Sequence, residues 1–271
     1  MSWEEREILL VVKTYPERSK KYGNTVCTAG ILEDTDEWVR IYPINFNVYN
    51  RLNLEKFIRI RAKIKKDDKD YLQRKESHKI DQDSVKVIDN SLIDPNKKGI
   101  WQERKRILKK VLAPSLEELW SKFEEDRTSL GFIRPKGNSI DFILSKPVEE
   151  IEIDIMKKIQ LNLFGQKLKK VDKIEKAFSY KFNCKGAECN GHKMICEDWE
   201  LLEAFRKWRK IYSTPEELEE KLRNKFLTEM ITQRDLYFFV GTHWKFPKWL
   251  IIGLFYPPKE KDQKITNFFF N

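Results

Sequence analysis

Hydrophobic and polar positions along the first quarter of the chain follow a pattern typical of short strands. Ile8–Lys13 is a continuous apolar run of strand length, and Thr25–Leu32 and Trp38–Tyr42 are β-branched segments separated by an acidic turn. Phe57–Ile64 alternates strictly between aliphatic and mainly basic residues. Strands joined by short polar turns predict a small curled β-sheet or barrel at the N-terminus, with a basic exposed face.

Helical periodicity begins after this strand-rich region. Ser115 and Glu118 form a capping box, and Thr214 followed by Pro215 is a typical helix start. The helices expected from the periodicity are Gly99–Leu112, Leu116–Glu124, Asp198–Tyr212 and a helix from Thr214 to about Ile231. Ile140–Leu144, Leu236–Val240 and Trp249–Phe255 are expected to be further strands, the last two of the buried type.

A cluster of metal-ligand residue types interrupts this pattern. Cys184, Cys189, His192 and Cys196 fall within thirteen residues in the order C-x4-C-x2-H-x3-C, with glycines in the short loops. Thiolates and imidazole are the ligands of tetrahedral structural zinc sites, so we interpret the cluster as a zinc-binding knuckle. A Cys3His iron–sulfur site and a redox disulfide pair are alternatives. In a further alternative Cys196 is merely buried, and Cys27 or His243 supplies the fourth ligand.

Together these elements predict an α+β fold in three parts. The parts are an N-terminal β-rich domain with a basic helix over residues 1–150, an α+β domain built around the Cys/His knuckle over 151–256, and a linker and tail over 257–271.

The net charge of the chain indicates a class of binding partner. The 271-residue chain has a formal net charge of +10, which favours a polyanion, and nucleic acid is the default choice. The alternative is the high lysine content of a thermophile's proteins, and the composition suggests a thermophilic host. Taken with the features described below, the charge favours an archaeon. No apolar run reaches the roughly twenty residues needed to span a bilayer, and the N-terminus lacks a signal-peptide pattern. We therefore expect a cytoplasmic protein with no membrane partner.

Two predicted helices combine basic and aromatic residues in a way that suits DNA or RNA. Cations on such helices can neutralise phosphates, and neighbouring rings can stack on bases. The alternatives are a solvated helix face and an aromatic stripe that belongs to the core. The candidate nucleic-acid-binding residues are Arg104, Lys105, Lys109, Arg206, Lys207 and Lys210.

The polar segment between residues 65 and 94 carries the candidate catalytic groups. Asp70, Arg74, Glu76 and His78 include the carboxylates and cations that a magnesium-dependent nuclease needs. Charge-rich loops also have this composition without any catalytic role. These residues are therefore candidates for catalysis, and the sequence alone does not assign a reaction.

The last ten residues, D-Q-K-I-T-N-F-F-F-N, follow a proline-containing charged linker. They resemble the PIP box, the motif that binds PCNA-type sliding clamps, in which an aliphatic residue and two aromatics plug a pocket on the clamp. Read from Asp262, the resemblance assigns the anchors to Ile265, Phe268 and Phe269; read from Gln263, it restores the glutamine and places Thr266, Phe269 and Phe270 at those positions. The alternative is a tail that packs back on the fold.

These observations lead to one hypothesis with two alternatives. The hypothesis is a nucleic-acid-binding accessory or repair protein with a structural zinc site, tethered to the sliding clamp by its tail at sites of DNA replication. The alternatives are a metal-dependent nuclease acting on DNA and a non-catalytic RNA-binding or defence-associated interaction module.

Overall fold

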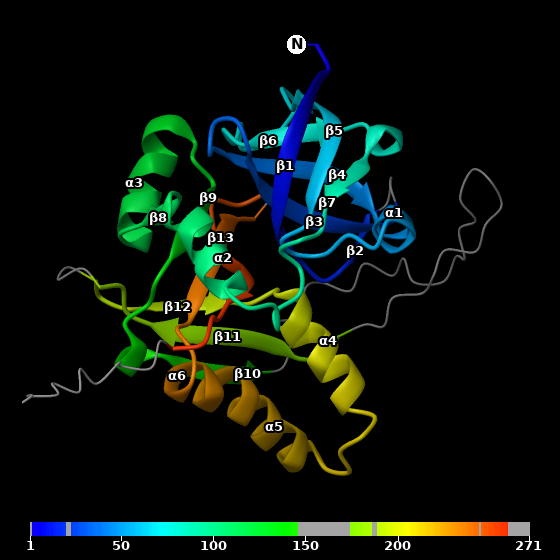
Figure 1. Cartoon of the computed structure of the whole chain (residues 1–271). Helices are drawn as coiled ribbons and strands as arrows, with labels where there is room; N and C mark the ends of the chain where they lie inside the picture. The colour runs from blue at the N-terminus through cyan, green and yellow to red at the C-terminus, as the bar shows by residue number, and fades with distance from the viewer. Residues whose placement is uncertain (1, 20–22, 146–173, 186–188, 244, 260–271) are drawn as a thin grey trace, which may run out of the picture.

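The computed structural model describes residues 2–19, 23–145, 174–185, 189–243 and 245–259. It confirms the predicted α+β class, with a β-barrel at the N-terminus and two further sheets with helices in the C-terminal part. Figure 1 shows the barrel above, and α5 (Pro215–Arg223) and α6 (Glu229–Thr232) at the bottom, below the sheets of the C-terminal part.

Five strands of the first sheet form a closed barrel. They run in the order β1-β3-β4-β6-β5, and the barrel closes because β1 pairs with both β3 and β5. β2 and β7 extend the sheet from β3 and β5. The bounds are β1 (Glu4–Lys13), β2 (Glu17–Ser19), β3 (Gly23–Leu32), β4 (Trp38–Asn45), β5 (Arg59–Lys66), β6 (Ser77–Ile80) and β7 (Lys86–Asp89), with α1 (Phe46–Arg51) and the 3-10 turn η1 (Gln82–Ser84) in the connections.

The apolar run in β1 is continuous because both faces of this strand are buried. Successive strand residues point to opposite faces. Ile8 and Leu10 therefore belong to the core inside the barrel, whereas Leu9 and Val11 belong to a second core outside it. This second core joins the barrel to the C-terminal part.

The alternation predicted for β5 is confirmed, but the expected basic face is not free. The aliphatic side chains point into the barrel. Outside, Arg59 donates to Glu33 at 2.9 Å and to Asp89, and Arg61 donates to Glu7 at 2.6 Å. Acidic residues of neighbouring strands and turns thus neutralise these arginines.

Two sheets make up the β-structure of the C-terminal part. One has the order β14-β13-β9-β8 and the other β10-β11-β12, and an isolated bridge between Cys196 and Ile251 connects them. Strands β8 to β10 lie before residue 150 in the chain, and β9 and β10 pair with β13 and β11 of the later part. The bounds are β8 (Leu112–Ala113), β9 (Leu130–Ile133), β10 (Asp141–Ser145), β11 (Ala177–Phe182), β12 (His192–Ile195), β13 (Tyr237–Thr242) and β14 (Trp249–Phe255).

Helices begin where the sequence places caps. The Ser115 hydroxyl accepts from the Glu118 amide, and the Thr214 hydroxyl accepts from the Glu217 amide, both at 3.2 Å. The helix expected from Thr214 consists of α5, a π-helical turn and α6 in succession. The bounds are α2 (Ile100–Lys109), α3 (Leu116–Asp126), α4 (Trp199–Trp208), α5 (Pro215–Arg223), η3 (Asn224–Thr228) and α6 (Glu229–Thr232), with the 3-10 turn η2 (Gly137–Ser139) before β10.

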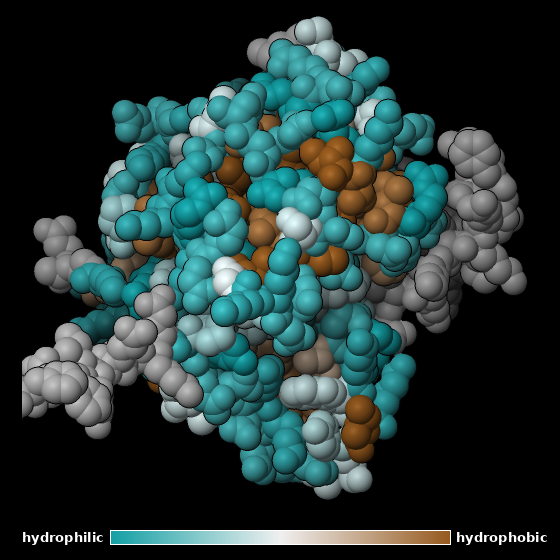
Figure 2. Space-filling model, in the orientation of Figure 1, coloured by the Kyte–Doolittle hydropathy of each residue, from teal (hydrophilic) through white to brown (hydrophobic). Residues whose placement is uncertain are grey.

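The surface seen in Figure 2 is mainly hydrophilic, and its hydrophobic atoms form small patches among polar ones. β7 contributes two exposed aliphatic side chains, Val87 and Ile88. None of the helices in the described residues combines the length and apolar character needed to cross a bilayer.

Candidate metal centre

Four potential metal ligands meet where the loop after β11 reaches the first turn of α3. Cys184 and Cys189 lie in this loop, His192 is the first residue of β12, and Glu117 is the second residue of α3. Their ligand atoms all lie within 4.8 Å of one another. Among the described residues this is the group of His, Cys, Asp and Glu side chains with metal-binding geometry.

The distances within this cluster suit a small tetrahedral ion. Nε2 of His192 lies 2.9 Å from Oε1 of Glu117, 3.2 Å from Sγ of Cys189 and 3.5 Å from Sγ of Cys184. For zinc bonds of about 2.0–2.3 Å, the edges of a tetrahedron are about 3.3–3.8 Å. The three distances from Nε2 of His192 differ from these edges by at most about 0.4 Å, and every other pair of ligand atoms lies within 4.8 Å.

Backbone donors hold the two sulfurs in place. The Leu116 amide donates to Sγ of Cys184 at 3.3 Å, and the Cys184 amide donates to Sγ of Cys189 at 3.0 Å. Gly191 has a φ of +89°, a conformation that a residue with a Cβ rarely adopts, so this glycine lets the chain turn into His192. Trp120 on α3 packs edge-on against the His192 ring at 5.5 Å.

The electrostatics of the cluster call for a cation. Burial raises the pKa of the Cys184 thiol to about 12, and the nearby Glu117 and Cys189 also act to raise it. Burial acts to raise the pKa of Glu117 as well, but its own amide, Cys189, Ser115 and His192 outweigh this and lower it. Oε2 of Glu117 is buried without a hydrogen-bond partner among the described residues. A metal ion would supply the missing positive charge and a partner for this oxygen.

Three of the four predicted ligands thus come together, and Cys196 does not join them. Cys196 lies four residues beyond His192 along an extended chain, which corresponds to about 13 Å. It is buried, and its amide donates to the Phe178 carbonyl at 2.8 Å. Glu117, which precedes Cys184 by 67 residues, takes its place. The capping box at Ser115 located the start of α3, but nothing in the sequence brings that helix end to the knuckle.

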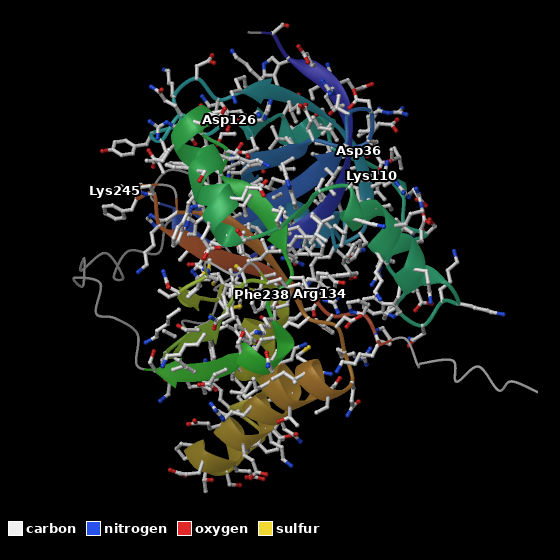
Figure 3. The ribbon with its side chains drawn as sticks, turned by 90° about the vertical axis from the view of Figure 1, so that its left-hand side faces the viewer. Asp36, Lys110, Asp126, Arg134, Phe238 and Lys245 are labelled. Carbon is white, nitrogen blue, oxygen red and sulfur yellow. The ribbon has the colours of Figure 1, made fainter. Side chains whose placement is uncertain are left out.

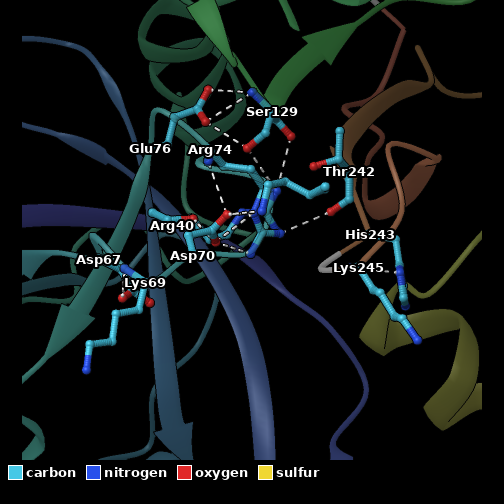
Figure 4. A network of polar contacts seen from close by, with 12 residues as sticks. Arg40, Asp67, Lys69, Asp70, Arg74, Glu76, Ser129, Thr242, His243 and Lys245 are labelled. Carbon is cyan, nitrogen blue, oxygen red and sulfur yellow. Dashed lines mark hydrogen bonds and ion pairs between the residues drawn. The ribbon is translucent and has the colours of Figure 1, made fainter.

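The candidate catalytic residues form a buried network instead of an open metal site (Figure 4). Nη2 of Arg74 pairs with Oδ2 of Asp70 at 2.6 Å, and the Ser77 hydroxyl donates to the same oxygen at 2.8 Å. Burial acts to raise the pKa of Asp70, but hydrogen bonds from Arg74 lower it overall. Arg74 also donates to the Thr242 carbonyl on β13 at 3.4 Å. The pair therefore links the barrel to the C-terminal part.

Glu76 serves the same junction. Its carboxylate accepts from the Ser129 amide at 2.9 Å and from the Ser129 hydroxyl at 2.7 Å, and Arg40 of β4 donates to the Ser129 carbonyl at 3.1 Å. Nδ1 of His78 lies 2.8 Å from the Glu76 carbonyl, and burial lowers the pKa of this histidine. The candidate catalytic residues Asp70, Arg74, Glu76 and His78 therefore all have partners within this network.

The structure also separates the six candidate nucleic-acid-binding residues. Arg104 is buried, donates to the Leu92 and Ile93 carbonyls and lies 4.2 Å from the Phe57 ring centre, so it is not available to a phosphate. Lys105 pairs with Asp235 at 3.4 Å, and Arg206 pairs with Glu203 at 2.8 Å. The exposed members of the set are Lys109, Lys207 and Lys210.

A basic surface that the sequence analysis missed lies beside the metal ligands. Lys181 and Lys193 are direct partners in the β11–β12 register and are both exposed. Lys136 and Lys185 are also exposed. They lie close to this pair, because the Lys136 amide donates to the Asn183 carbonyl at 2.8 Å and Lys185 directly follows Cys184. We call Lys136, Lys181, Lys185 and Lys193 the knuckle lysines. The exposed lysine among buried rings in F-S-Y-K-F was the sequence signal for Lys181.

The candidate clamp-binding residues Gln263, Ile265, Phe268 and Phe269 lie outside the described residues.

Comparison with protein families divides the chain at the same place as the change from barrel to C-terminal sheets. A model described as Domain of unknown function (DUF8758) matches residues 4–110, and one described as Domain of unknown function (DUF8757) matches residues 112–269. The four potential metal ligands all lie within the second match. A comparison with curated proteins found no match.

Proposed function

The chain belongs to the family described as Domain of unknown function (DUF8757), and we propose that this member is a zinc-containing nucleic-acid-binding protein. The observation that carries the proposal is the pair Lys181 and Lys193, which face each other across two strands beside the Cys/His/Glu cluster. The metal would fix the adjoining ends of β11 and β12, which carry Lys181 and Lys193, and these lysines would contact phosphates.

Zinc is the metal that suits these donors best. Two sulfurs, one imidazole and one carboxylate are all accepted by zinc, which has no strong geometric demand beyond a tetrahedral arrangement. Iron–sulfur clusters are usually held by four thiolates, and this cluster offers only two. Four protein ligands leave no open position in a tetrahedral site, which favours a structural role for the metal.

The facing lysines are best explained by an anionic partner. Like charges directly opposite each other on neighbouring strands destabilise a sheet. Asp141 is the next residue across from Lys181, but its carboxylate accepts from Arg223 at 3.2 Å. No ion pair joins any of the knuckle lysines to another residue in the described ranges. With a net charge of +10 on the chain, the cost of this arrangement is recovered when a polyanion binds.

The test compares the double variant Lys181→Glu/Lys193→Glu with a matched control, Lys86→Glu/Lys98→Glu. The control also reverses two exposed lysines, but on and beyond β7. Anisotropy of labelled single- and double-stranded DNA and RNA is measured from about 50 to 200 mM salt. We expect the first variant to lose at least about tenfold in affinity and to show a salt slope smaller by roughly 2, since two phosphate contacts disappear.

The control should retain most of the affinity. Equal losses of affinity in both variants would show that only the net charge matters, which contradicts a specific role for Lys181 and Lys193. Failure of the unmodified chain to bind any of the nucleic acids at low salt would overturn the whole proposal.

The tail supports a second part of the proposal, attachment to a sliding clamp. Its support is the PIP-box resemblance of the last ten residues, and the family match runs through Phe269 and so includes the anchors Ile265 and Phe268. Capture of a PCNA-type clamp by the full chain should be lost in Phe268→Ala/Phe269→Ala and retained in Lys264→Ala. Loss in Ile265→Ala favours the frame from Asp262, and loss in Thr266→Ala favours the frame from Gln263. Capture that survives the double alanine variant would overturn this part.

A further inference from the structure

A pocket of about 180 Å³ lies between the segment that follows β9, Lys185 and the segment from α6 to β13. Ile140, Met230 and Leu236 supply apolar parts of its lining. Pockets for drug-sized ligands are usually about 300–1,000 Å³. This pocket is therefore sized for one small group or for the end of a larger ligand.

The charged part of the lining is strongly basic. It comprises four cationic side chains, Arg134, Lys185, Arg234 and Lys259, and one carboxylate, Asp235. Asp235 is shared, because Nη2 of Arg134 lies 2.8 Å from one of its oxygens and Nζ of Lys105 lies 3.4 Å from the other. One carboxylate cannot neutralise this number of cations.

The remaining cations have weak or no acidic partners. Arg234 lies 3.6 Å from Glu229, which Lys225 also contacts at 2.8 Å. Lys259 donates to the Ile231 carbonyl, a neutral acceptor. Lys185 is exposed and has no ion pair with another described residue. The pocket therefore holds an excess of positive charge that suits an anion carrying more than one charge.

Apolar side chains beside the cations make the pocket suitable for a nucleotide. The Arg134 guanidinium lies 5.3 Å from the centre of the Tyr237 ring, and Figure 3 shows Arg134 at mid-height in the molecule, below the barrel. Nucleic-acid-binding surfaces combine cations for phosphates with apolar or ring surfaces for bases. Here the cations and the apolar lining occur in the same small cavity.

We propose that this pocket binds the terminal nucleotide of a single-stranded nucleic acid through its end phosphate. This inference rests on the proposed nucleic-acid function and names the part of the ligand that is recognised. A terminal phosphate has a charge of about −1.5 to −2 at neutral pH, because its second pKa is about 6. An internal phosphodiester has a single charge, so several converging cations favour the end of a strand over its interior.

The metal centre and the pocket share a structural element. Lys185 directly follows the ligand Cys184, and Pro135, which also lines the pocket, forms an isolated bridge with Cys184. The knuckle lysines continue from this point along β11 and β12. A strand whose end lies in the pocket can therefore run onto the basic surface beside the metal.

The test uses the full chain and one internally labelled single-stranded oligonucleotide with four kinds of end. The ends are hydroxyl at both, phosphate at the 5′ end, phosphate at the 3′ end, and phosphate at both. We expect one of the singly phosphorylated strands to bind about tenfold tighter than the hydroxyl-ended strand. The double variant Arg234→Gln/Lys259→Gln, which leaves the knuckle lysines intact, should lose this preference and keep the affinity for the hydroxyl-ended strand, which also shows that it is folded.

Lys193→Ala is the matched control. It removes a cation from the basic surface outside the pocket, so it should weaken all four strands by a similar factor and preserve the preference for a phosphate end. Binding without any end preference, or a preference that survives the pocket variant, would overturn this inference alone. Absence of binding to every strand would also overturn this inference, and the proposed function falls with it only if duplex DNA and RNA do not bind either.

Discussion

Cys189 and Cys196 are the same residue type in the same short segment, but their sulfurs have different surroundings. Cys189 lies 3.2 Å from His192, whereas Cys196 is buried at the end of β12. We expect Cys189→Ser to lower zinc affinity by on the order of a hundredfold and Cys196→Ala to leave one zinc per chain. Metal content after passage over a chelating resin measures both. Equal loss of metal in the two variants would restore Cys196 as a ligand.

Glu117 offers the second residue-level prediction. Glu117→Gln keeps the shape of the side chain but removes the charge that faces the buried sulfurs, so zinc affinity should fall by about 10- to 100-fold. Glu118→Gln is the neighbouring control, because Glu118 pairs with Lys122 at 2.7 Å and is not in the ligand cluster. Competition with a fluorescent zinc chelator gives the two affinities, and identical values would remove Glu117 from the site.

Arg104 shows how a basic residue on a helix can belong to the core. Its guanidinium donates to the Leu92 and Ile93 carbonyls and lies 4.7 Å from the Trp101 ring centre. Arg104→Ala leaves buried carbonyls without donors, so the free energy of unfolding should fall by about 2–4 kcal/mol. Lys109→Ala, on the same helix but exposed, should change it by less than about 0.5 kcal/mol. Urea denaturation measures both values. An unchanged free energy of unfolding in Arg104→Ala would contradict a structural role for this buried guanidinium.

At the scale of elements, the end of β1 shows how packing changes the ionisation of a side chain. Nζ of Lys13 lies 4.0 Å from the Trp199 ring centre and donates to the Leu54 carbonyl at 3.3 Å. Burial lowers its pKa from 10.5 to about 8, although Glu55 and Glu203 act in the opposite direction. Strand β1 and helix α4 together produce this burial.

The lowered pKa predicts a pH dependence of stability. Between about pH 8 and 10.5 the unfolded chain binds more protons at Lys13 than the folded chain does, so the contribution of Lys13 to the free energy of unfolding rises with pH in this window. The full difference is about 3 kcal/mol, at about 1.4 kcal/mol per unit of pKa. Thermal or urea unfolding from pH 7.5 to 10 should show that Lys13→Met removes this rise relative to the unmodified chain. Parallel pH profiles for the two proteins would contradict the lowered pKa.

At the scale of the whole molecule, the barrel and the C-terminal part share a core. Leu9 and Val11 of β1 pack in the same cluster as Phe132, Phe239 and Ile252 of the four-stranded sheet. The Glu76–Ser129 hydrogen bonds and the Arg74–Thr242 contact lie at the same junction. Separating the two parts would expose these apolar side chains and leave buried polar groups unpaired.

The shared core predicts that the two family matches do not correspond to independently stable folds. A fragment of residues 2–111 should be unfolded or aggregated at 25 °C, and the full chain should unfold in one cooperative transition. Coincident denaturation curves from far-UV and near-UV circular dichroism, with hydrodynamic size for the fragment, check this expectation. Two separate transitions, or a compact monomeric fragment, would contradict it.

Local patterns in the sequence determined the elements and part of the site. The alternation in Phe57–Ile64 predicted a strand with one buried face, the caps at Ser115 and Thr214 predicted helix starts, and the cysteine–histidine spacing located three ligands. Each of these depends on residues within about one element, where period and capping chemistry act directly. They were sufficient for the α+β class and for the barrel.

Only the tertiary structure decided which side chains meet across long separations in the chain. It brought Glu117 to Cys184, buried Arg104, and joined Arg74 and Glu76 to strands of the C-terminal part. The physical reason is that a carboxylate or a guanidinium has the same local signal on a surface as in a core. Its role depends on which elements pack against it, and that packing is a property of the whole chain.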